Sequence, residues 1–192
     1  MTSSSLHAWR TLLIASIACG LLACDPGDDP GNAAPPDEGG TTTVEIALVN
    51  AYDWSQVAMD SDPFRAERPD DASCASGFQV EAGVFEVETD LCSWGTFQQP
   101  LLANVSAGTP LRIIAWHLPL WAPEPAEGVL RLQVGDQPIW ELTVPIPLGA
   151  MLYDEEIPAP VDLYADDPVT LHIHNHGTNS WRFAVFHALE EG

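Results

Sequence analysis

Three histidines, His172, His174 and His176, stand at alternate positions near the end of the chain, in the stretch LHIHNHGTNSW (171–181). Alternate residues of a β-strand point to the same face and lie about 6.7 Å apart. Because a zinc–nitrogen bond is about 2.0 Å long, two neighbouring imidazoles can converge on one ion, whereas three along a straight strand cannot. The pair could be His172 with His174 or His174 with His176, and it needs a third ligand from another strand, for which His117 and His187 are available. The predicted Zn site is made of His172, His174 and His117.

The same stretch has a simpler interpretation as the outer side of an ordinary strand. Val169, Leu171 and Ile173 occupy the opposite face and are suited to a hydrophobic core. We therefore expect the imidazoles to point outward, where they would serve as hydrogen-bonding surface groups. Both interpretations stay open at the level of the sequence.

Aromatic residues form a second candidate for chemistry. Trp116 and Trp121 flank His117 in the Pro-rich stretch WHLPLWAPEPAEG. Aromatic planes beside polar groups can stack on the C–H face of a sugar while imidazole or amide groups bond its hydroxyls. The alternative is that these aromatics only close one end of the fold. The predicted ligand-binding residues are Trp116, His117, Trp121, His174, His176, Asn179 and Trp181.

Carboxylates cluster at residues 60–71 and 153–168 and could hold a structural Ca ion in loops. No twelve-residue EF-hand spacing is present. The chain also lacks a G-x-S-x-G elbow, a P-loop and a G-x-G-x-x-G motif, so no catalytic residue can be named. The sequence therefore favours a binding protein over an enzyme.

Strand-type periodicity dominates the chain from residue 44 onward. The expected strands are short, rich in β-branched and aromatic residues, and bounded by Gly, Pro, Asp or Asn. They cover residues 43–49, 78–89, 100–108, 111–118, 129–134, 139–146, 169–175 and 181–189. Hairpin turns are expected at VGDQP and HGTN, with Gly135 and Gly177 supplying permissive backbone. The prediction is an all-β fold, a two-sheet antiparallel β-sandwich of about eight strands that is jelly-roll-like.

The N-terminal residues 1–23 have the features of a signal peptide. Arg10 precedes the apolar run 11–23, which is too short to span a bilayer. The following LLAC resembles the lipobox of bacterial lipoproteins, which implies cleavage before Cys24 and attachment of acyl chains to its sulfur. The resemblance implies a protein anchored by lipid to a membrane of the bacterial cell envelope, with its domain outside the cytoplasm. Leu22 is less usual there than Ala or Ser, which leaves open ordinary cleavage near Ala18–Ala23 and a secreted protein.

After the lipidated Cys24, residues up to 43 are rich in Pro, Gly and acids and are expected to form a disordered tether to a domain over 44–192. Removal of Arg10 leaves five Arg against 28 acids, so the mature chain carries 5 − 28 = −23. Such a surface repels nucleic acid and anionic lipid headgroups, and we expect neither as a direct partner.

Cys74 and Cys92 are the only cysteines of the expected domain, and in an oxidising compartment we predict a disulfide between them. This bond would fasten the far end of a long irregular excursion, residues 51–77, which we expect to be an ordered loop overhanging one rim of the sandwich.

By strand number and composition, residues 44–190 resemble galactose-binding-like and carbohydrate-module sandwiches. The expected anchor, the tether and the exposed Trp and His groups lead us to predict an envelope lipoprotein whose sandwich is a binding module for a glycan or another envelope component. The alternative is a metal-dependent envelope enzyme or metal-handling protein that uses His172, His174 and His117.

Overall fold

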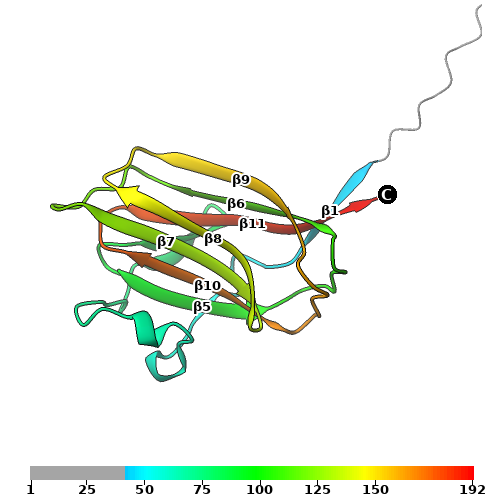
Figure 1. The fold of residues 1–192 in the computed structure, drawn as a ribbon, viewed down its shortest axis with the longest axis horizontal. Helices are drawn as coiled ribbons and strands as arrows, with labels where there is room; N and C mark the ends of the chain where they lie inside the picture. Colours follow the sequence, from blue (N-terminus) through cyan, green and yellow to red (C-terminus); the bar gives the residue numbers. More distant parts are fainter. Residues whose placement is uncertain (1–41) are drawn as a thin grey trace, which may run out of the picture. The chain divides into compact units, whose positions relative to one another are not determined.

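The protein folds as two antiparallel β-sheets packed face to face, as seen in a computed structural model that describes residues 42–192 (Figure 1). The predicted signal peptide, Cys24 and most of the tether lie outside the described residues. Within 42–192, no helix is long and apolar enough to cross a membrane. The prediction of an all-β sandwich is confirmed.

The first sheet has the strand order β3-β4-β11-β6-β9, with β1 paired to β11. Its strands are β1 (Thr43–Ala47), β3 (Phe78–Glu81), β4 (Val84–Glu88), β6 (Pro110–His117), β9 (Met151–Pro158) and β11 (Ser180–Glu191). The second sheet has the order β2-β5-β10-β7-β8. Its strands are β2 (Ser55–Gln56), β5 (Trp94–Pro100), β7 (Ala126–Val134), β8 (Gln137–Ile146) and β10 (Pro168–Asn175).

The core lies between the two sheets and follows from the alternation of apolar residues. Leu111 and Ile113 of β6 face Leu171 and Ile173 of β10 across this interior, and all four are essentially inaccessible to solvent. Full burial of one such side chain contributes about 1.5–3 kcal/mol. One open side of the sandwich is closed by a hydrogen bond from Trp140 Nε1 on β8 to Glu155 Oε2 on β9 (2.9 Å), two strands at the sheet edges.

The described residues contain eleven strands rather than about eight. Three strands were missed: the two-residue β2, which lies inside the expected loop at 51–77, β5, whose WGTFQQP sequence has weak periodicity, and β9, whose carboxylates were expected to form a loop. The acids of β9 are accommodated because it is an edge strand with one face in solvent. The expected strand at 100–108 is wrong, since only its first residue belongs to a strand. The expected strand at 78–89 is a hairpin, β3–β4, turned at Ala82 and Gly83, both of which have positive φ.

The expected hairpin at VGDQP is confirmed, since β7 pairs with β8 and Gly135 has a φ of 55°. The hairpin expected at HGTN is wrong, because β10 and β11 belong to different sheets and the connection crosses between them. A glycine is required at position 177 because neighbouring atoms leave no room for a side chain. A Cβ at this position would lie 2.7 Å from the backbone oxygen of Trp121.

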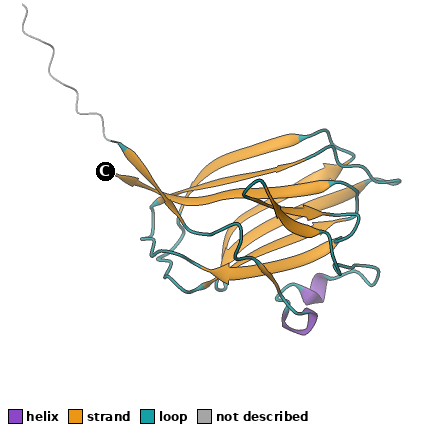
Figure 2. Ribbon diagram, turned by 180° about the vertical axis from the view of Figure 1, so that it is seen from behind, coloured by secondary structure: helices purple, strands orange, loops and turns teal. Residues whose placement is uncertain are grey.

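The excursion predicted for 51–77 is ordered, and it includes β2 and two short 3-10 helices, Met59–Ser61 and Arg65–Glu67 (Figure 2). It does more than overhang a rim, because it packs on the outer face of the second sheet, where Phe64 contacts His172 of β10. The predicted disulfide between Cys74 and Cys92 is confirmed and joins the end of the excursion to the segment before β5.

Candidate functional site

The candidate site is a cavity of about 180 Å³ at the end of the sandwich where β10 ends, here called the rim pocket. It brings together three of the residues that the sequence singled out, Trp121, His174 and His176. It also contains Asp71, which the sequence placed in a possible Ca cluster rather than among the ligand-binding residues, and Ser93 from the segment before β5, which the sequence did not single out. Asp71 and Ser93 come from segments far apart in the sequence, so no local spacing could have predicted that they line the same pocket.

The backbone of Trp121 is fixed by a hydrogen bond, whereas its indole ring is exposed to solvent. Thr178 N donates to Trp121 O at 2.7 Å, which ties the 118–126 connection to the turn after β10. The close approach at Gly177 makes this contact possible. Trp121 is 58% exposed to solvent, whereas Trp residues are on average highly buried in folded proteins.

The imidazoles of His174 and His176 face each other, with Nε2 atoms 2.7 Å apart. His176 follows the last residue of β10, so the chain is free to turn its ring toward His174. The His174 ring also lies against Trp94, with ring centroids 4.6 Å apart. Burial, and then the neighbouring His176 and Arg131, lower the pKa of His174 to about 4. Both Nε2 atoms therefore belong to a pair in which one ring donates and the other accepts.

The floor of the rim pocket is a buried hydrogen-bond network. Asn175 Nδ2 donates to Thr89 Oγ1 (2.7 Å) and to Gly177 O (3.2 Å), and the Thr89 hydroxyl donates to Asn179 O (2.6 Å). Thr89 follows β4 of the first sheet, whereas Asn175 ends β10 of the second. The network thus locks the two sheets together beneath His176 and holds the pocket in one shape.

Three other predicted ligand-binding residues support the rim from within. His117 and Trp181 are buried, with ring centroids 4.7 Å apart. His117 Nδ1 donates to Leu118 O (2.8 Å), so its Nε2 accepts from the Tyr153 hydroxyl (3.1 Å). Burial lowers the pKa of His117. Asn179 has a φ of 101° and donates through Nδ2 to Pro119 O.

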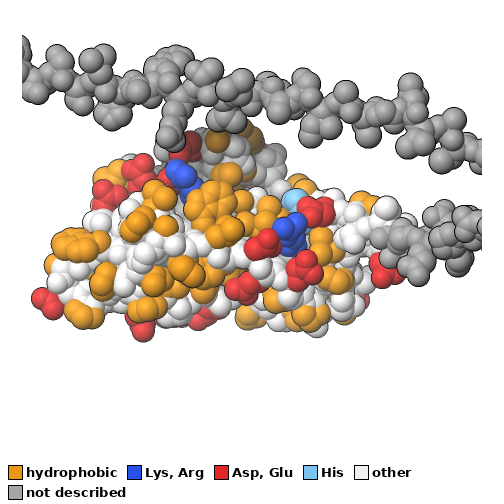
Figure 3. All heavy atoms as spheres, turned by 90° about the horizontal axis from the view of Figure 1, so that it is seen from above, with side chains coloured by type: hydrophobic (Ala, Val, Ile, Leu, Met, Phe, Trp, Pro, Cys, Tyr) orange, Lys and Arg blue, Asp and Glu red, His pale blue; other side chains and the backbone are white. Residues whose placement is uncertain are grey.

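Trp116 lies away from the rim pocket, on the outer face of the first sheet. It pairs with Leu152 of β9 on one side and Arg182 of β11 on the other. An open hollow of about 480 Å³ runs beside it, lined mainly by apolar side chains including Leu118 and Met151. Figure 3 shows hydrophobic and acidic side chains interspersed on the face seen from above the view of Figure 1.

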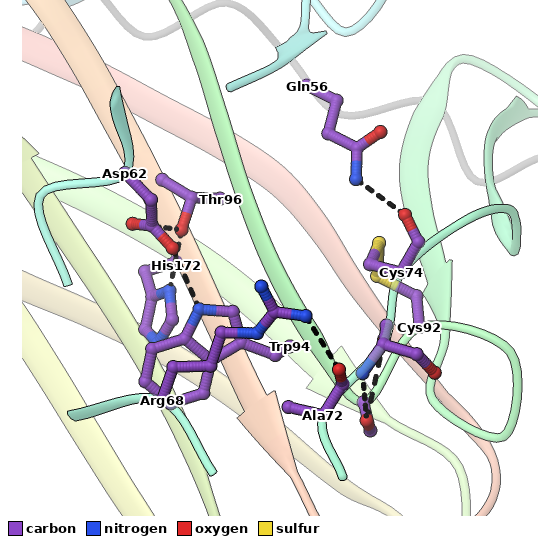
Figure 4. The surroundings of a disulfide bond; sticks show 11 residues. Gln56, Asp62, Arg68, Ala72, Cys74, Cys92, Trp94, Thr96 and His172 are labelled. Atoms are coloured by element: carbon purple, nitrogen blue, oxygen red, sulfur yellow. Dashed lines mark hydrogen bonds between the residues drawn. A yellow bond between two sulfur atoms is a disulfide. The ribbon is translucent and has the colours of Figure 1, made fainter. Parts of the chain in front are cut away.

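His172 does not reach solvent, in contrast to the outward-facing imidazole that strand alternation predicts. It points to the outer face of the second sheet, but Phe64 and Trp94 cover it. The buried carboxylate of Asp62 accepts from Trp94 Nε1 (2.8 Å) and from the Thr96 hydroxyl (2.9 Å) (Figure 4). Because Thr96 has only one proton to donate, it accepts from His172 Nδ1–H at 2.9 Å. Burial lowers the pKa of His172 to about 3, so the ring is neutral.

The structure does not bring the predicted zinc ligands His172, His174 and His117 together. His117 lies on β6 of the first sheet and His172 on β10 of the second. Across residues 42–192, no three His, Cys, Asp or Glu side chains gather in a way that could hold a metal ion. Two acids of the carboxylate cluster at 153–168 make other contacts: Asp154 binds Arg112, and Asp162 accepts from Ala107 N. The metal-dependent enzyme proposed from the sequence therefore gains no support from these residues.

No protein-family model and no curated protein matches the chain. Among solved structures, it is similar to a CBM4 module (14% identity, 73% of this chain and 89% of that chain, TM-score 0.43). It is also similar to the family 11 carbohydrate-binding module from Clostridium thermocellum in complex with a β-1,3-1,4-mixed-linked tetrasaccharide (9% identity, 76% and 95% coverage, TM-score 0.43). These neighbours are carbohydrate-binding modules, but the similarity is too low to transfer a ligand or a residue's role to this chain.

Proposed function

We propose that the domain is a glycan-binding module and that it takes its ligand at the rim pocket. The observation that carries this proposal is the exposed Trp121 indole beside the paired imidazoles of His174 and His176. An indole offers a flat face to the C–H groups of a sugar ring, while imidazole and hydroxyl groups can bond its hydroxyls. Asp71 and Ser93 also line the pocket and add a carboxylate acceptor and a hydroxyl group.

The size and charge of the rim pocket narrow the ligand class. A volume of about 180 Å³ lies below the 300–1,000 Å³ that is usual for drug-sized ligands, so the pocket suits one ring of a glycan rather than several. Its lining contains Asp71 but no Lys or Arg, and the full chain has a net charge of −22. We therefore expect neutral or amino sugars to bind and anionic sugars to be repelled.

The test is a glycan array followed by calorimetry with the full-length mature protein and the best glycan. Trp121→Ala should weaken binding at least tenfold, because it removes the stacking surface. Trp116→Ala is the matched control, since Trp116 lies on another face of the domain. If Trp116→Ala abolishes binding while Trp121→Ala does not, the ligand site is wrong. If no glycan binds, the proposed function itself is wrong.

We also propose that Cys24 is lipidated and anchors the protein to a membrane of the bacterial cell envelope. The apolar run, the Cys and the acidic tether support this, since the tether has a use only if its upstream end is held. Wild-type protein should partition into the detergent phase of a Triton X-114 extraction, and Cys24→Ser should partition into the aqueous phase or remain unprocessed. An aqueous wild type with an unmodified N-terminus would instead indicate a secreted protein.

The course of β11 puts the rim pocket and the start of β1 at opposite ends of the domain. Its first residue, Ser180, follows the turn that lines the rim pocket, and Glu191 at its other end pairs with Thr43 of β1. A twelve-residue strand spans roughly 37 Å at 3.4 Å per residue. The rim pocket thus lies at the opposite end of the domain from the strand that leads to the tether.

A further inference from the structure

From the geometry of the rim pocket, we propose that His174 and His176 bind one divalent transition-metal ion that prefers tetragonal coordination, Cu²⁺ or Ni²⁺. This inference goes beyond glycan binding and does not depend on it. It also differs from the zinc site predicted from the sequence, because it uses neither His172 nor His117.

The distance between the two Nε2 atoms determines which ion fits. They lie 2.7 Å apart. An ion placed 2.0–2.1 Å from both would subtend an angle of about 80° between them. That angle is close to the right angle of square-planar or octahedral coordination and well below the tetrahedral angle that structural Zn²⁺ adopts. Among first-row divalent ions, Cu²⁺ binds nitrogen ligands most tightly.

The surroundings of the pair favour a cation. Asp71 lines the same pocket, whereas no described Lys or Arg does, and the carboxylates of Glu67 and Asp71 oppose the effect of Arg131 on His174. His174 is held by its contact with Trp94, so little of its motion must be lost when an ion binds. Because no third ligand from residues 42–192 converges with these two rings, the remaining positions would be taken by water or by a hydroxyl of a bound ligand.

The experiment titrates CuCl₂ into the metal-free, full-length mature protein without a His tag, followed by calorimetry and electron paramagnetic resonance. We expect one Cu²⁺ per chain, with hyperfine splitting from two nitrogens. His176→Ala and His174→Ala should each weaken binding at least tenfold, and Zn²⁺ should bind at least tenfold more weakly than Cu²⁺. His187→Ala is the matched control, because His187 contacts Glu45 on the first sheet, away from the pocket.

His176 is exposed, so removal of its side chain should not unfold the domain. His176→Ala is therefore the decisive variant. Near-UV circular dichroism verifies this. If His176→Ala binds Cu²⁺ as tightly as the wild type, or if the spectrum shows no nitrogen ligands, the proposal is wrong. Trp121→Ala separates the two proposals: it should lose glycan binding and keep Cu²⁺ binding.

Discussion

The Phe64 ring lies against the His172 imidazole, with ring centroids 4.4 Å apart, and seals a strand face that alternation assigns to solvent. Arg131 of β7 lies above the same Phe64 ring, 5.4 Å from its centroid. The excursion is thus part of the packed structure of the second sheet, and the properties of His172 depend on it.

Burial of His172 should make stability depend on pH. The pKa of His172 is about 3 in the native state, against an ordinary value of 6.5. Between pH 3 and pH 6.5, His172 therefore binds a proton in the unfolded chain but not in the native state. Stability should therefore fall as pH is lowered from 6.5, by up to about 1.4 kcal/mol per pH unit for this one group. Urea denaturation at pH 7, 6 and 5 should show a shallower decline for His172→Asn. Equal slopes in the two proteins would contradict the burial of His172.

Asp62→Asn should destabilise the protein by about 2 kcal/mol. The substitution replaces one buried carboxylate oxygen, which accepts a hydrogen bond, by an amide NH2 group, which would then face another donor. The two carboxylate oxygens of Asp62 receive bonds from Trp94 Nε1, Thr96 and the Phe64 backbone. Denaturant unfolding measures the effect. The control Asp60→Asn changes an exposed acid of the same segment and should have little effect.

Loss of the disulfide should cost about 3 kcal/mol, as expected for a closed loop of this length, since Cys74 and Cys92 are 18 residues apart. The double substitution Cys74→Ala and Cys92→Ala should lower the urea midpoint. Reductant should lower the midpoint of the wild type and leave that of the double variant unchanged. If reductant has no effect on the wild type, the bond does not contribute to stability.

Gly177→Ala should destabilise the domain by about 1–3 kcal/mol and displace Trp121, because the new Cβ would lie 2.7 Å from Trp121 O. Thermal unfolding and Trp fluorescence measure the two effects. Gly149→Ala is the matched control, since a Cβ there would meet nothing within 4 Å. Similar behaviour of the two variants would show that close packing at Gly177 does not hold the pocket.

The strand at residues 111–118 could be predicted from the sequence because it is a run of strand length, rich in β-branched and aromatic residues and bounded by Pro110 and Pro119. The disulfide could be predicted because the expected domain has only two cysteines. The edge strand β9 could not, since its acids interrupt the apolar pattern that marks a strand.

The sequence by itself determined the all-β character of the domain, its strand faces and the Cys74–Cys92 pair, because these depend on residue type and local period. Only the tertiary structure decided that Phe64 buries His172, that β10 and β11 belong to different sheets, and that Trp121 meets His174 and His176. These are contacts between residues distant in sequence, made when the excursion and the inter-sheet turns pack. The local period of a strand specifies which way a side chain points, but what covers it depends on segments packed from elsewhere in the chain.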